Sequence, residues 1–206
     1  MIMDNTYRVY GPNLYSRALV ESDVEHVKRI LYDWEDWPLT DEKAESLTKV
    51  WSQKVKLWQA PFFEGMPRQE STTLFCLKSN DLPVCIDRSA QYDTTAEHIL
   101  TATCPDHRLN GYVKEVTKLM AIPGWDLMNT QKSILKRRVG VQSMGDNHPR
   151  HAKEGTVSHS SNRYTQGDYV ETVITLEEWT AFKNSSLYAG WAIDCIIYPT
   201  YPGDPL

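Results

Sequence analysis

Residues 104–115 constrain the fold of this chain more than any other segment, because they join a strand-like run to a helix-like run through a short loop. Pro105 ends the strand, since proline has no amide to give to a sheet ladder. A helix is expected to begin near Asn110, followed by an apolar helical face of Val113, Val116, Leu119 and Met120. The unpaired amides at a helix start carry the positive end of the helix dipole, so the segment predicts an anion site.

Arg108 and Gly111 give this loop the composition of a pyrophosphate site. A glycine lets the backbone approach a phosphate closely, because no side chain stands in the way. The alternative for Gly111 is a glycine that simply precedes a helix. Arg108 is expected either to pair with the phosphate charge or to be a solvated loop arginine, and both interpretations stay open.

The order Arg108-Leu-Asn-Gly111-Tyr-Val113 resembles the coenzyme A loop of the GNAT acyltransferases, which reads Arg/Gln-x-x-Gly-x-Gly/Ala. The first glycine matches, and Val113 stands where the family has a small residue. Residues 15–30 are similar to the family's opening strand and first helix. Residues 153–179 are similar to the closing hairpin of the branch that acetylates ribosomal-protein amino termini.

Both outer segments also have a physical interpretation of their own. Ser22 and Glu25 are spaced as a capping box at the start of the first helix. Residues 166–168 are predicted to form a turn, and residues 169–176 are rich in the β-branched side chains typical of a strand. Residues 189–198 are expected as an extra strand that covers a gap near the cofactor cleft.

The remaining patterns complete a mixed α/β (α+β) order. A second helix is predicted over residues 41–59, followed by strands at 72–77, 84–87 and 98–103. The resemblance implies a mixed, mostly antiparallel sheet flanked by helices and splayed at the fourth strand, where the cofactor enters. We expect this domain to span residues 1–180, with residues 181–206 as a C-terminal extension packed on the same domain.

The stretch between the third helix and the closing hairpin departs from the family. Residues 139–143 are expected as the fifth strand, and Asn147 resembles an asparagine that often follows it. Little chain then remains before the hairpin, so either the fourth helix is shortened or missing, or the fifth strand begins earlier. The basic residues of 132–138 are expected on a solvated face. The alternatives are contacts to the 3′-phosphate of coenzyme A, an acidic substrate or nucleic acid.

Composition narrows the class of protein. The chain has 206 residues and a net charge of −5, which suits one folded domain and disfavours a general nucleic-acid partner. No apolar run is long enough to span a membrane and no signal-peptide pattern is present, so we expect a cytoplasmic protein without a membrane partner. The cysteines, expected as buried free thiols, are Cys76, Cys85, Cys104 and Cys195. His148 and His151 are interpreted as an exposed loop, and no metal is expected.

The resemblance implies transfer of an acetyl group from acetyl-coenzyme A to a primary amine of a protein or small molecule. The residues expected to bind acetyl-CoA are Thr103, Arg108, Leu109, Asn110, Gly111, Tyr112, Val113 and Asn147. A base must take a proton from the amine, and the candidates near the ends of central strands are Asp87, Glu97 and His98. Backbone amides at the splay would stabilise the thioester oxygen.

Two other functions remain open at this point. One is a degenerate member of the fold that serves as a protein-binding or regulatory module. The other is a nucleic-acid-modifying enzyme, for which residues 132–138 are the only hint. Four tryptophans crowd the two opening helices, and they indicate either core packing or an aromatic-walled amine pocket: Trp34, Trp37, Trp51 and Trp58. The acceptor and the oligomeric state are not specified by these patterns.

Overall fold

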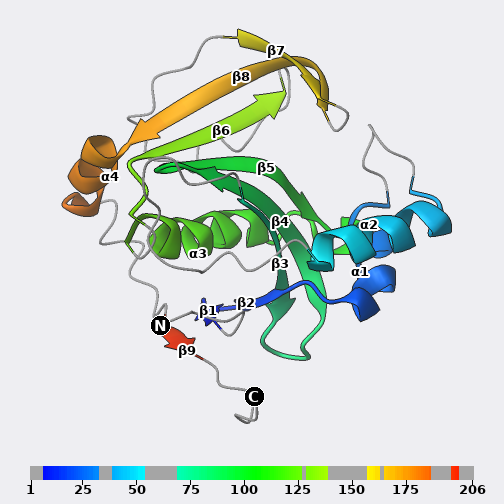
Figure 1. Ribbon diagram of the computed structural model, residues 1–206. Coiled ribbons are helices and arrows are strands. Elements are labelled where there is room, and N and C mark those ends of the chain that lie inside the picture. Colours follow the sequence, from blue (N-terminus) through cyan, green and yellow to red (C-terminus); the bar gives the residue numbers. More distant parts are fainter. Residues whose placement is uncertain are drawn as a thin grey trace.

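The computed structural model describes residues 7–32, 39–53, 69–126, 129–138, 157–162, 165–186 and 196–199. The described strands form one sheet in the order β7-β8-β6-β5-β4-β3-β2-β1-β9 (Figure 1). The strands are β1 (Tyr7–Tyr10), β2 (Leu14–Ala18), β3 (Gln69–Leu77), β4 (Pro83–Tyr92), β5 (Thr95–Thr103), β6 (Lys132–Arg138), β7 (Val157–Asn162), β8 (Thr165–Thr175) and β9 (Ile196–Pro199). The helices are α1 (Val24–Ile30), α2 (Asp41–Gln53), α3 (Tyr112–Asp126) and α4 (Leu176–Lys183).

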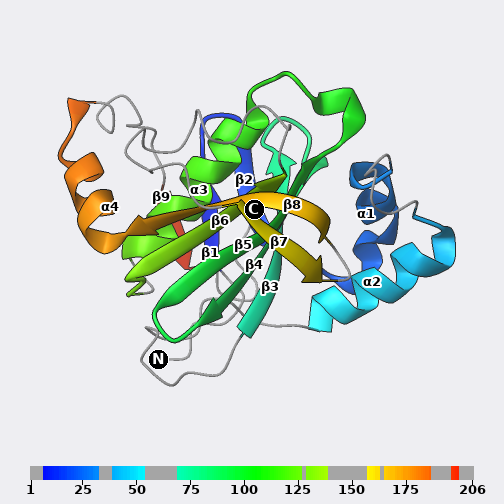
Figure 2. The ribbon, with the colours of Figure 1, turned by 90° about the horizontal axis from the view of Figure 1, so that it is seen from above.

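Helices cover both faces of the sheet. Figure 2 shows α3 on one face and α1 with α2 on the other. Strand side chains alternate between these two layers, as the pleat requires. Leu74 and Ile86 pack with α1 and α2, whereas their neighbours Phe75 and Cys85 pack with α3. This arrangement of three layers, a mostly antiparallel sheet flanked by helices, is the predicted α/β (α+β) class.

The sheet is antiparallel except at one pair of strands. β5 and β6 are parallel and pair only from Thr95 with Lys132 to His98 with Leu135. β5 then continues to Thr103 and β6 to Arg138 without further pairing between them. The expected splay is therefore confirmed, and it lies between β5 and β6.

β6 corrects the expected position of the fifth strand. The strand that follows the third helix is Lys132–Arg138, so the fifth strand of the family pattern begins earlier than residue 139. This stretch is a strand between β5 and β8 inside the sheet, and its first basic side chain, Lys132, is exposed as expected. Residues 139–156, where the fourth helix was in question, lie outside the described residues.

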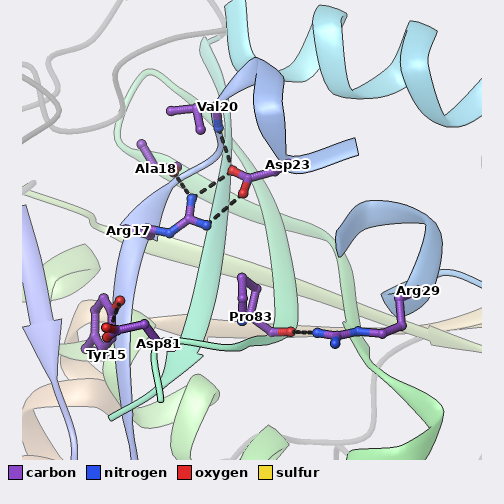
Figure 3. A network of polar contacts seen from close by, with 8 residues as sticks. All are labelled: Tyr15, Arg17, Ala18, Val20, Asp23, Arg29, Asp81 and Pro83. Atoms are coloured by element: carbon purple, nitrogen blue, oxygen red, sulfur yellow. Dashed lines mark hydrogen bonds and ion pairs between the residues drawn. The ribbon is translucent and has the colours of Figure 1, made fainter. Parts of the chain in front are cut away.

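The 3₁₀ turn Glu21–Asp23, which precedes α1, is closed by a different residue from those predicted. Asp23, and not the expected pair Ser22 and Glu25, closes the turn by accepting a hydrogen bond from the Val20 amide at 2.9 Å. Arg17 donates two further bonds of 2.7 Å to the same carboxylate (Figure 3). Burial raises the pKa of Asp23, but the hydrogen bonds from Arg17 and the Val20 amide, together with the positive charge of Arg17, outweigh burial, so the pKa lies below its ordinary value. The ion pair ties the end of β2 to the first helix.

The C-terminal segments also differ in detail. Asn162 pairs with Thr165, so β7 and β8 join there, and residues 166–168 lie within β8 and not in a turn. β9 pairs with β1 at the edge of the sheet, several strands away from the splay (Figure 1). The described part of the extra strand therefore does not cover the splay.

Candidate functional site

The loop between β5 and α3 has an unusual backbone. It begins with a 3₁₀ turn, Pro105–His107, in which the Arg108 amide donates to the Pro105 carbonyl at 3.2 Å. Leu109 and Gly111 then adopt left-handed conformations, with φ of 66° and 79°. Gly111 is suited to this conformation, whereas a leucine there is strained. The strain and the full exposure of the Leu109 side chain indicate a loop shaped for its backbone.

The loop leaves a run of amides available at the start of α3. The amides of Lys114 and Glu115 donate to the Gly111 carbonyl, at 3.1 and 3.3 Å. Among the described residues, the five amides before them have no acceptor; they belong to Leu109, Asn110, Gly111, Tyr112 and Val113. No atom lies within 4 Å of the position that a Cβ on Gly111 would take, so the space beside these amides is open.

Side chains at the base of the loop hold its shape. The Nε atom of Arg108 donates to the Thr103 carbonyl at 3.2 Å. The Nδ2 atom of Asn110 donates to the carbonyls of His107 and Arg108, at 3.1 and 3.3 Å. Thr103 is buried and its hydroxyl lies 3.3 Å from the Cys85 thiol. Thr103 and Asn110 thus act on the loop through their contacts, and the backbone offers the binding groups.

A β-bulge on β5 coincides with the start of the splay. Arg88 pairs with Leu100 and Ser89 pairs with His98, so Ile99 is the extra residue. His98 is also the last residue of β5 that pairs with β6. Bulges re-aim the backbone and end pairing. Here the bulge releases the β6-facing edge of residues 99–103, which can then pair with an extended ligand.

Two of the three predicted base candidates lie together on the α3 face. The Asp87 carboxylate is buried and accepts hydrogen bonds of 2.7 Å from the hydroxyls of Ser89 and Thr101. The Nδ1 atom of His98 lies 3.7 Å from Asp87 Oδ1. The His98 side chain remains 23% exposed, so it can meet a reactant while its ring lies beside the buried carboxylate.

Glu97 lies on the opposite face of the sheet from His98, because neighbouring residues of a strand alternate. It pairs with Ala90 on β4 and with Ile134 on β6, and its side chain is buried. Its face is the one that α1 and α2 cover. The three candidates therefore do not form one cluster: the sheet separates Glu97 from the pair of Asp87 and His98.

The face that carries Glu97 also holds a buried cation that sequence reasoning missed. Arg88 is almost fully buried, forms an ion pair with Glu70, and has its guanidinium carbon 5.1 Å from the ring centroid of Trp51. Of the two interpretations of the tryptophans, core packing holds at Trp51, which is buried in the cluster that α1 and α2 form with the sheet and meets an arginine of the protein itself. The other three tryptophans of that expectation lie outside the described residues, as do Asn147, His148 and His151.

Glu115 is a second residue without a sequence signal. It lies in the first turn of α3, yet its buried carboxylate binds the turn between β1 and β2 and not the loop. Within the described ranges no cluster of histidine, cysteine and carboxylate side chains is suited to a metal ion. Cys76, Cys85 and Cys104 are buried free thiols, as predicted, and Cys195 lies outside the described residues.

Several solved structures have a fold similar to that of this chain. A GNAT-family acetyltransferase from Bacillus anthracis matches 83% of the chain and 99% of its own length, with a TM-score of 0.64 and 14% identity. The fold is that of the GNAT acetyltransferases. A GCN5-related N-acetyltransferase from Brucella melitensis matches 92% of the chain and 86% of its own length, with a TM-score of 0.65 and 11% identity.

Other neighbours with the GNAT fold carry more specific names. A candidate ribosomal-protein-serine acetyltransferase from Vibrio cholerae covers 84% of the chain and 99% of its own length, at a TM-score of 0.64 and 12% identity. A chimeric spermidine N-acetyltransferase, built from Vibrio cholerae SpeG and hSSAT, covers 81% and 98%, at a TM-score of 0.58 and 14% identity. No family model and no curated protein matches the sequence. In the described part of the chain, no helix is long and apolar enough to cross a membrane.

Proposed function

We propose that this protein is an N-acetyltransferase that transfers the acetyl group of acetyl-coenzyme A to a primary amine of a protein or small molecule. One observation carries the proposal: a parallel strand pair splays at a bulge, and the strand on one side leads into a helix start with available amides. The splay offers a slot for an extended thioester arm, and the amides offer a site for its pyrophosphate. The GNAT fold of the neighbours supports the same reading.

The donor would lie along β5 and end at α3. The free edge of residues 99–103 pairs with the amide groups of the pantetheine arm. The amides of residues 109–113 bind the pyrophosphate, with the charge of Arg108 beside them. Backbone amides near the bulge at Ile99 then point at the thioester oxygen and stabilise the charge that develops on it.

The acceptor amine must lose a proton before or during attack, because a lysine-type amine has a pKa near ~10.4 and an α-amine near ~7.7–8.0. Two candidate bases flank the start of the splay, one on each face. His98 lies beside Asp87 on the α3 face, and Glu97 lies on the face of α1 and α2. The replacements His98→Gln and Glu97→Gln separate them, since loss of the true base lowers kcat by roughly 10²–10⁴-fold at neutral pH. That loss diminishes as the pH approaches the pKa of the amine.

Calorimetric titration with acetyl-coenzyme A tests the donor site. We expect micromolar binding by the wild-type protein and loss of binding in Gly111→Glu, whose carboxylate would occupy the phosphate position. Gly111→Gln is the matched variant, because glutamine has the size of glutamate and meets the same positive φ of 79° without a negative charge, so the difference between the two isolates the charge. Gly111→Glu binding as tightly as the wild type would refute the assignment of the loop.

The acceptor is then sought with two panels, polyamines and peptides with a free amino terminus. Turnover of either defines the acceptor class, and donor binding without turnover indicates a regulatory module that keeps the cofactor site. No binding at millimolar acetyl-coenzyme A would refute the enzyme and favour a protein-binding role. The buried free thiols support a reducing compartment such as the cytoplasm.

A further inference from the structure

We propose that Glu115 and the turn between β1 and β2 position the amides that bind the pyrophosphate, which makes this distant turn a working part of the donor site. The inference rests on the proposed function. Glu115 belongs to the first turn of α3, and its own amide donates to the Gly111 carbonyl at 3.3 Å. A shift of Glu115 therefore moves the glycine at the centre of the loop.

The Glu115 carboxylate is held by three hydrogen bonds from the turn. Its Oε1 atom accepts from the amides of Asn13 and Leu14, both at 2.8 Å. Its Oε2 atom accepts from Asn13 Nδ2 at 2.9 Å. The residue is only 7% exposed, and the bond from the Leu14 amide is buried. Bonds to an ionised acceptor are about twice as strong as neutral ones, and the carboxylate is thus a firm anchor for the helix start.

The turn itself is braced so that it can serve as an anchor. The Gly11 amide donates to the Leu14 carbonyl at 2.7 Å, and Lys78 Nζ donates to the Gly11 carbonyl at 3.1 Å. A Cβ on Gly11 would lie 2.3 Å from Glu115 Oε1. Among the described glycines only Gly111 has a positive φ, so Gly11 is required for close approach of the carboxylate and not for its backbone conformation.

Electrostatics alone gives Glu115 the opposite role, so the direction in which its removal changes the affinity for the donor tests the inference. A carboxylate in the first turn of α3 repels a pyrophosphate bound at the same helix end, so removal of its charge would tighten anion binding. If the carboxylate instead positions the amides, its removal weakens binding. We expect displacement of the amides by about 1 Å to weaken binding of the pyrophosphate by roughly 10²-fold. This loss exceeds the gain in affinity from removing the screened repulsion of one charge near the surface.

The experiment compares two donors on four proteins. The wild type, Glu115→Ala, Asn13→Ala and the control Glu45→Ala are titrated with acetyl-coenzyme A and with S-acetylpantetheine, which lacks the pyrophosphate. Glu45 is an exposed carboxylate on α2, so its replacement removes the same charge without touching the turn. We expect Glu115→Ala to weaken acetyl-coenzyme A binding by roughly 10-fold to 100-fold and to leave the affinity for S-acetylpantetheine unchanged.

Asn13→Ala removes only one of the three hydrogen bonds to Glu115, and Asn13 is exposed, so this variant is expected to fold even if Glu115→Ala does not. It should also weaken acetyl-coenzyme A binding, by a smaller factor than Glu115→Ala. Equal or tighter binding of acetyl-coenzyme A by both variants, with wild-type binding intact, would overturn the inference while leaving the proposed function standing. Loss of affinity for both donors would overturn it too, since that marks a general structural effect. Failure of the wild type to bind acetyl-coenzyme A would refute the proposed function itself.

Discussion

Replacement of Gly11 by alanine should destabilise the protein through its effect on Glu115. The added Cβ would lie 2.3 Å from Glu115 Oε1 and 3.1 Å from Cδ, whereas ordinary contacts begin at 3.4 Å. The carboxylate would have to move by about 1 Å, the difference between 2.3 and 3.4 Å. Such a movement lengthens the two bonds of 2.8 Å that Oε1 accepts beyond hydrogen-bond range.

The magnitude follows from those two bonds. A hydrogen bond to a charged group contributes about 1.5–3 kcal/mol, and part of the loss is recovered as the turn relaxes. We therefore expect Gly11→Ala to lower the free energy of unfolding by about 2–4 kcal/mol, which corresponds to a fall in Tm of roughly 5–12 °C for a chain of this size. Urea unfolding followed by tryptophan fluorescence measures the free energy directly.

A double-mutant cycle identifies the cause. In a Glu115→Ala background the clash no longer exists, so Gly11→Ala should cost less than about 0.5 kcal/mol there. A cost in the wild-type background below about 0.5 kcal/mol would refute the argument from close approach. An equal cost in both backgrounds would refute it as well, because the effect would then come from the turn and not from the carboxylate.

Three further predictions concern other parts of the fold. Because Arg17 holds the pKa of Asp23 below its ordinary 3.8, the ion pair stabilises the protein above about pH 4, and this stability is lost as the pH falls through the folded-state pKa. Asp23→Asn should therefore lower the free energy of unfolding by about 3 kcal/mol at neutral pH. It should also flatten the acid limb of a profile of urea stability against pH. Burial raises the pKa of the Cys85 thiol to about 12, so mass spectrometry should find it unalkylated by iodoacetamide at pH 8 until urea unfolds the protein. Trp125 and Trp179 stack at 5.7 Å, so Trp179→Ala should lower the free energy of unfolding by about 3–5 kcal/mol, and a loss below about 1 kcal/mol would contradict that packing.

Features that depend on neighbouring residues were predictable from the sequence. β5 ends just before Pro105, and Val116 and Leu119 of α3 are buried in the core of the protein. Both features were predictable because a proline that ends a strand and the periodicity of a helix are local properties of the sequence. Gly111 has the positive φ that a loop glycine permits. The loop that carries the proposed donor site could therefore be predicted from the sequence.

Features that depend on strand pairing were not predictable in this way. The bulge at Ile99 shifts the alternation of β5, and only the register with β4 shows that His98 joins Asp87 while Glu97 faces the other side. The turn expected at 166–168 has a glycine and an aspartate, yet the pairing of Asn162 with Thr165 places those residues inside a strand. Register is decided by partners far away in sequence, which a local pattern does not record.

The pairing of β1 with β9 has a consequence for how the protein is made. Among the described residues, the ladder between β1 and β2 has the single pair Tyr10 and Tyr15, whereas β1 pairs with β9 along its whole length. β1 is the first described strand to leave the ribosome and β9 the last. Until residues 196–199 have been synthesised, β1 presents an open edge that can recruit a strand from another nascent chain. The late arrival of β9 thus makes aggregation during synthesis a hazard of this topology, and removal of that strand would make the hazard permanent.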